Sequence, residues 1–149
     1  MALADLIRPE VVKVPLVGKT KNEVIRELVQ LLLDAGRITE LESVYDALLT
    51  REALGSTGLE QGIAVPHAKT RAVHRLTAAI GIAPQGVDFQ SADGEPSKLF
   101  FLLLAPPDQS GPHIQALAEI ARLAKSATFL RLLAGASSGT EVAALIREG

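Results

Sequence analysis

A continuous apolar stretch limits the folds open to this chain more than any other feature of its sequence. Residues 98–104 read Lys-Leu-Phe-Phe-Leu-Leu-Leu, with no polar residue after the lysine. A strand with one face in water would alternate apolar and polar residues, so this run predicts a central strand covered on both faces. Apolar segments at 76–83 and 63–65 predict further strands. Pro15 limits a fourth strand, at 13–16, to a sheet edge, because proline cannot donate to a ladder.

Helices are predicted between these strands, because three hydroxyl–carboxylate pairs have the spacing of a capping box. The pairs are Thr20 with Glu23, Thr39 with Glu42, and Ser138 with Glu141. Apolar residues at helical spacing follow each pair.

Two more helices are predicted near the C-terminus, one beginning at Pro112 and one at 128–134. The core-facing residues predicted for the first of them are Ile114, Leu117, Ala118 and Ala121. Helices and strands thus alternate, which predicts an α/β fold, a three-layer sandwich with a mixed, mostly parallel β-sheet flanked by helices. No repeat or long linker divides the chain, so residues 1–149 are expected to form one domain.

Composition excludes several classes of function. The chain has no cysteine, a net charge of −2 and only 3% aromatic residues, which argues against disulfides, thiolate metal sites and nucleic-acid binding. The longest apolar run, 99–105, is far shorter than a membrane-spanning helix. The first ten residues lack the basic start and long apolar region of a signal peptide. We therefore expect a cytoplasmic protein with no nucleic-acid partner and no direct membrane insertion.

One histidine lies where α/β folds place functional groups. His67 follows the apolar segment Ile63–Val65 and Pro66, and functional side chains gather at the C-terminal ends of strands. Pro66 fixes one backbone dihedral and helps to aim the imidazole. The position alone is also compatible with a histidine that merely ends a strand.

Two other segments could complete an anion site with His67. Residues 54–58, Leu-Gly-Ser-Thr-Gly, form an amide-rich loop of a kind that often meets anions. Arg51 precedes this loop, and its guanidinium suits either phosphate or the carbonyls at a helix C-terminus. His113 follows Pro112 near a helix N-terminus, where the helix dipole favours a neutral imidazole and a nearby anion.

Other candidate sites are weak. Gly18-Lys19-Thr20 looks like the end of a phosphate-binding P-loop, but the earlier glycine that this motif requires is Lys13. The histidines His67, His74 and His113 lack the spacing of metal ligands, and His74 is expected to be a solvated surface residue. Neither a metal nor a cofactor is expected.

Two stretches together resemble a known family. Residues 51–68, REALGSTGLEQGIAVPHA, are similar to the active-site segment of enzyme IIA domains of the bacterial phosphoenolpyruvate-dependent sugar phosphotransferase system. The class is the fructose/mannitol type, which includes the nitrogen-regulatory IIA proteins. Residues 103–113, LLAPPDQSGPH, resemble the segment with that family's second active-site histidine. The order of elements also matches, so the resemblance covers nearly the whole chain.

The resemblance implies a role for each candidate residue. His67 would accept a phosphoryl group on Nε2 from the phosphocarrier HPr or its nitrogen-branch relative. It would then pass the group to a IIB partner or keep it as a signal to a regulatory target protein. His113 would stabilise the phosphoryl group, and Arg51 would contact the phosphate or the partner. The chain is thus expected to be a phosphotransferase, and its LGSTG loop and length favour the nitrogen-regulatory type.

Alternative functions remain compatible with the sequence. They are a regulatory binding module that works without phosphorylation, the IIA component of a fructose/mannitol-type sugar transporter, and a serine hydrolase using Ser56 and His67. The hydrolase lacks a nucleophile elbow. Two residues depart from the family pattern: Glu60 replaces a usual Gly or Ala and is expected to point to solvent, and Ala68 replaces the commoner glycine.

Overall fold

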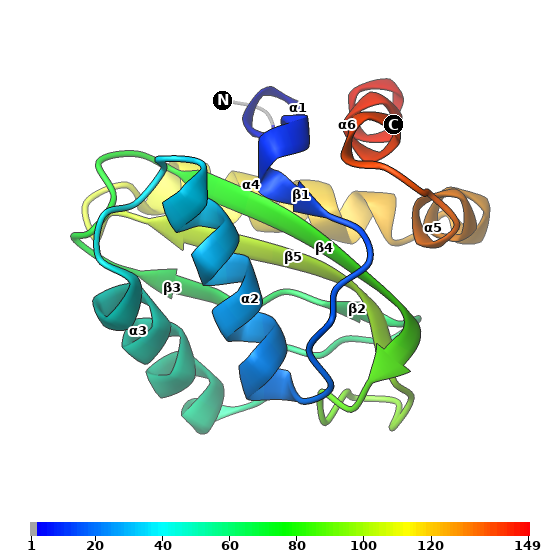
Figure 1. Ribbon diagram of the computed structural model, residues 1–149, viewed down its shortest axis with the longest axis horizontal. Coiled ribbons are helices and arrows are strands. Elements are labelled where there is room, and N and C mark those ends of the chain that lie inside the picture. The colour runs from blue at the N-terminus through cyan, green and yellow to red at the C-terminus, as the bar shows by residue number, and fades with distance from the viewer. Residues whose placement is uncertain (1–2) are drawn as a thin grey trace.

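The strand predicted from the apolar run lies inside the sheet of the computed structural model, which describes residues 3–149 (Figure 1). This strand, β5 (Ser97–Ala105), pairs antiparallel with β4 (Thr77–Val87). Every residue of β5 except Lys98 is buried. Alternate side chains of β5 enter two separate hydrophobic cores, as expected of a strand covered on both faces.

Three short strands complete the sheet. β1 (Val12–Lys13) runs parallel to β4 at one edge, close to the edge position predicted for 13–16. β2 (Ile63–Ala64) and β3 (His67–Lys69) both run parallel to β5 on its other side. The sequence did not predict β3, so His67 is the first residue of a strand and does not merely follow one.

Helices cover both faces of the sheet (Figure 1). One face packs against α2 (Lys21–Asp34) and α3 (Leu41–Leu54). The elements on the other side are α1 (Leu3–Leu6), α4 (Ser110–Leu123), α5 (Ala127–Ala134) and α6 (Gly139–Glu148). The 3₁₀ turn η1 (Pro9–Val11) precedes β1, and its buried residue Val11 belongs to the core beneath α2 and α3. The predicted three-layer α/β sandwich with a mixed, mostly parallel sheet is confirmed. Within residues 3–149, none of the helices has the length and apolar character needed to cross a membrane.

The helix caps agree only in part with the prediction. Thr20 and Glu23 form the complete capping box at the start of α2. Ser138 accepts a bond from the Glu141 N–H, but the Glu141 carboxylate binds the N–H of Ser137. The box predicted at Thr39 is wrong.

Glu40, not Thr39, is the N-cap of α3, and no side chain bonds the cap. The backbone of Glu40 is extended, with φ −127° and ψ 91°, so the helix begins one residue later than the box requires. Glu42 then lies at the second helical position and pairs with Arg26 of α2.

The core face predicted for α4 is wrong except at Leu117, which is half-buried and packs against the core. The helix begins at Ser110, two residues before Pro112, and its buried residues are His113, Ala116, Ile120 and Leu123. The side chain of Ile114 is 66% exposed, and Ala118 and Ala121 are exposed as well. The prediction placed Ile114 on the core face and His113 outside it, whereas the helix turns His113 inward and Ile114 outward.

The two threonines provide a matched test of the caps. We expect Thr20→Ala to lower the free energy of unfolding by about 1 kcal/mol, because the Thr20 hydroxyl accepts the Glu23 N–H at 3.2 Å. Thr39→Ala should change it by less than about 0.5 kcal/mol, because Thr39 is exposed and caps nothing. Urea unfolding of both variants measures the difference, and equal losses would contradict this description of the caps.

Candidate functional site

His67 is held with one ring nitrogen engaged and the other available. Its backbone pairs with Leu103 of β5, which fixes the height of the residue along the sheet. Its Nδ1 lies 2.7 Å from the carbonyl oxygen of Val65. Because a carbonyl can only accept, Nδ1 carries the proton and donates it, and the lone pair is on Nε2. The half-buried imidazole is therefore set up as an Nε2 nucleophile.

His113 lies against His67. The two ring centroids are 5.4 Å apart and the rings meet edge to face, at 78°. Only 5% of His113 is exposed, and its Nε2 has no hydrogen-bond partner among the described residues. Buried polar atoms are rarely left unpaired, so this nitrogen is placed to bond a group that enters the site beside His67.

Burial and neighbouring charges favour the neutral form of the His113 ring. Burial lowers the pKa of His113, and the neighbouring His67 and Lys69 lower it further. A neutral imidazole has one N–H to donate and one lone pair. His113 can therefore donate a single hydrogen bond to an anion without itself adding charge.

Arg51 reaches the site from the last turn of α3. Its Nη1 donates to the carbonyl oxygen of Gly55 at 2.8 Å, beyond the end of the helix. Arg51 and His67 together line two adjoining cavities of about 460 and 230 Å³. Arg51 therefore has both contacts that its sequence position allowed. It bonds a carbonyl at the end of the helix, and it lies beside His67.

Lys69 adds a cation that the sequence reasoning missed. It lies two residues after His67 on β3, and alternate residues of a strand share a face, so this spacing was the available signal. Its Nζ donates to the Ser110 hydroxyl at 3.0 Å and thereby links β3 to the first residue of α4. Lys69, Ser110 and His113 line the same cavity as His67.

A buried carboxylate, also missed from sequence, holds the loop between α3 and β2. Glu52 accepts bonds from the backbone N–H and the hydroxyl of Thr57. The ammonium of Lys21, at the start of α2, lies 2.7 Å from the same carboxylate. The Ser56 hydroxyl bonds the carbonyl of Phe89, which argues against a role as a nucleophile. These bonds fix the loop that brings Thr57 to the cavity also lined by Arg51 and His67.

Exposed apolar side chains surround the cavity. Leu54 is 83% and Ile114 66% exposed, and both line it together with the half-buried Leu117. Such residues gathered beside a reactive group are typical of a surface that binds another protein. Sequence reasoning missed this surface because it assigned Ile114 to the core.

The weaker candidates do not form sites. The backbone N–H groups of Val17 and Gly18 donate to the carboxylate of Glu27, which occupies the loop that looked like a P-loop. His74 is exposed, as expected, and so is Glu60. In the part of the chain that the structure describes, no three His, Cys, Asp or Glu residues are grouped to hold a metal.

Comparison with known proteins places this site in a family. The sequence profile described as phosphoenolpyruvate-dependent sugar phosphotransferase system, EIIA 2, matches residues 5–149. The chain belongs to this family. Its EIIA relatives include proteins of two kinds, named for sugar transport and for nitrogen regulation, and domains of this family are components of phosphotransfer.

Curated EIIA relatives represent both kinds. The fructose-specific EIIA component of Haloferax volcanii is 41% identical over 103 residues, covering 69% of this chain and 67% of that protein. The nitrogen regulatory protein of Bradyrhizobium diazoefficiens is 36% identical over 128 residues, covering 83% and 80%. The fructose-specific EIIABC component of Bacillus subtilis is 36% identical, and this chain spans only 19% of its length.

Solved EIIA structures share the fold. Nitrogen regulatory protein IIA-Ntr of Neisseria meningitidis superposes with a TM-score of 0.89 at 29% identity, over 97% of this chain and 98% of that one. IIA mannitol of Escherichia coli gives 0.78 at 28% identity, over 92% and 96%. The same enzyme in complex with phosphorylated IIB mannitol gives 0.80 at 26% identity, over 95% and 97%.

The lowered pKa of His113 predicts a pH-dependent stability. Below the ordinary value of 6.5 the unfolded chain takes up a proton at His113 that the folded protein resists. The contribution of His113 is thus present above that pH and is lost as the pH falls toward the folded-state pKa. We expect the free energy of unfolding to fall more steeply between about pH 7 and pH 5 in wild type than in His113→Asn.

Urea unfolding at several pH values measures this slope. His74→Asn is the matched control, because His74 is exposed and should leave the slope as in wild type. Equal slopes for wild type and His113→Asn would show that His113 is protonated in the folded protein as readily as in the unfolded chain.

Proposed function

We propose that His67 is the phosphoryl acceptor of a protein-to-protein relay. The donor is a phosphohistidine of an HPr-type phosphocarrier. Its N–P bond breaks as a bond forms between phosphorus and Nε2 of His67, and the donor nitrogen recovers its lone pair. The observation that carries the proposal is the Nδ1 bond to Val65, because it leaves the Nε2 lone pair directed away from the backbone.

The neighbouring groups suit the transition state of this transfer. Phosphoryl transfer is loose and in line, with negative charge on the equatorial oxygens, so positioning and electrostatics supply most of the catalysis. The Nε2 of His113 has no partner among the described residues, and in this proposal it carries the proton and donates to one phosphoryl oxygen. The cations of Arg51 and Lys69, which line the cavity, offset the remaining charge.

No carboxylate that could act as a general base lines the described part of the site, which suits a carrier of phosphoryl groups. No Asp or Glu is among the described residues that line the two cavities around His67. Hydrolysis of a phosphohistidine needs an activated water, and a carboxylate is a usual group to activate one. Glu52 is nearby in the chain, but Thr57 and Lys21 occupy its oxygens. The phosphoryl group therefore persists until a protein acceptor arrives.

The apolar surface formed by Leu54, Ile114 and Leu117 is the docking surface of this proposal. It surrounds the nucleophile, so a donor and an acceptor must bind it in turn and cannot bind together. A IIB domain is the proposed acceptor, supported by the similarity to E. coli IIA mannitol, which has been solved in complex with phosphorylated IIB.

Among the two kinds of relative, we favour the nitrogen-regulatory type, in which the phosphorylation state is itself the signal to a target protein. The TM-score of 0.89 with the N. meningitidis protein supports this choice. Mixing the phosphorylated chain with a purified fructose- or mannitol-class IIB domain tests it. Persistence of the phosphoprotein supports regulation, and rapid transfer supports a sugar transporter.

The acceptor assignment is tested by phosphorylation in vitro. Incubation with phosphoenolpyruvate, enzyme I and an HPr-type carrier should add one acid-labile phosphate to wild type and none to His67→Ala. His74→Ala is the control and should be labelled like wild type, because His74 is exposed and does not line the cavities around His67. Intact-protein mass spectrometry at neutral and acidic pH gives the count. Full labelling of His67→Ala would reject the proposal.

The docking surface is tested with two matched leucines. Leu54→Asp should slow phosphorylation by the carrier about tenfold or more, which corresponds to about 1.4 kcal/mol, because a charge then enters an apolar contact. Leu132→Asp should leave the rate unchanged, since Leu132 is 54% exposed on α5 and does not line the cavity. Equal rates for the two variants would place the docking surface elsewhere.

A further inference from the structure

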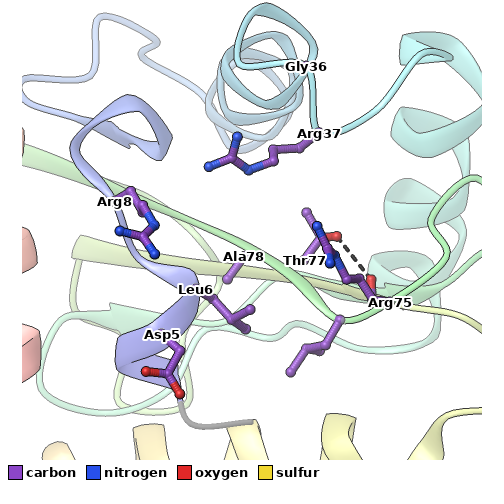
Figure 2. A pocket seen from close by; sticks show the side chains of 9 residues that line it. Asp5, Leu6, Arg8, Gly36, Arg37, Arg75, Thr77 and Ala78 are labelled. Carbon is purple, nitrogen blue, oxygen red and sulfur yellow. Dashed lines mark hydrogen bonds between the residues drawn. The ribbon is translucent and has the colours of Figure 1, made fainter.

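A second cavity, of about 520 Å³, lies where α1, the turn after α2 and the start of β4 meet (Figure 2). None of the residues that line it lines the cavities around His67. Its volume is within the range of small-molecule sites in proteins. Neither the phosphoryl chemistry nor the docking surface uses this cavity.

Arginines from three separate segments surround this cavity. Arg8 follows α1, Arg37 follows α2, and Arg75 precedes β4 (Figure 2). Like charges repel, so such convergence is unfavourable unless anions offset it. Fork-shaped guanidinium groups match phosphate and carboxylate oxygens in pairs.

The protein's own carboxylates do not account for all three arginines. Glu10 pairs with Arg37 at 3.3 Å and interacts more weakly with the charge of Arg8, and Asp5 of α1 lines the cavity. Across residues 3–149, neither Arg8 nor Arg75 forms an ion pair. The three cations thus outnumber the two carboxylates, and the residues that line the cavity have an excess of positive charge.

The lining also has an apolar side. Leu76 and Ala78 are 3% and 4% exposed, and the half-buried Leu6 faces the same space. The Thr77 hydroxyl donates to the carbonyl of Arg75, which holds the start of β4 in place. A rigid apolar wall beside several guanidinium groups suits a ligand with both a flat or carbon-rich part and two or more negative charges.

We propose that this cavity binds a small polyanion that carries phosphate or carboxylate groups on an organic framework, with the dimensions of a mononucleotide or a sugar bisphosphate. Arg8 and Arg75 hold the charged groups, and Leu6 and Ala78 contact the framework. Binding does not require His67. The floor of the cavity nevertheless adjoins the phosphoryl site through the sheet, because Ala78 and His67 both pair with Leu103.

Titration of ¹⁵N-labelled protein followed by NMR tests the proposal. The probes are adenosine 5′-monophosphate, fructose 1,6-bisphosphate, citrate and inorganic phosphate, at about 0.15 M salt so that nonspecific charge effects are screened. We expect saturable shifts at the amides of Thr77 and Ala78, with a Kd below about 1 mM for at least one organic anion. The phosphate esters and citrate distinguish a phosphate ligand from a carboxylate ligand.

Matched variants locate the binding. Arg75→Ala and Arg8→Ala should each weaken it about tenfold, whereas Arg122→Ala, an exposed arginine of α4, should not. His67→Ala should bind as wild type does, which separates this proposal from that of the phosphoryl relay. The absence of saturable shifts, equal losses in Arg122→Ala, or binding of inorganic phosphate as tight as that of the organic anions would each overturn the proposal.

Discussion

Burial of β5 on both faces is the constraint on which the rest of the structure depends. A strand without a polar face must lie inside a sheet with helices on each side, and both hydrophobic cores include side chains of β5. The same strand positions both histidines. His67 pairs with Leu103, and the chain that leaves β5 at Ala105 turns into α4, whose first turn contains His113. Any shift in the register of β5 would separate the two imidazoles.

The site combines a few groups with different tasks. His67 presents a lone pair, His113 presents one neutral N–H, and Arg51 and Lys69 present charge. Burial favours the uncharged form of His113, and the neighbouring His67 and Lys69 favour it further by lowering the same pKa. A protonated His113 would hold an anion more tightly and would retain it. A neutral donor therefore suits a group that must arrive and also leave.

The sequence was sufficient where one local rule decided the outcome. The apolar run predicted β5, and the Thr20–Glu23 spacing predicted the start of α2. It was insufficient where two rules competed. The Thr39–Glu42 spacing is equally good, but Glu42 bonds Arg26 of a neighbouring helix, a contact that no local pattern contains.

The candidate site, too, was predicted from the sequence only in part. His67, His113 and Arg51 line one cavity, as their motifs suggested, although their chemical roles stay predictions. Lys69 was missed because β3 was not predicted, and without a strand its spacing from His67 has no meaning. Ile114 was misassigned because hydrophobicity alone favours the core, whereas a protein that exchanges a group with partners keeps apolar residues outside.

The bond from His67 to Val65 also has a regiochemical consequence. In the proposed transfer, only the phosphohistidine isomer on Nε2 is open, because Nδ1 is bonded to the carbonyl oxygen of Val65. This acceptor is a backbone carbonyl, so no change of the side chain at position 65 removes it. The proposed choice of a single isomer therefore rests on the backbone and not on a side chain that one substitution could remove.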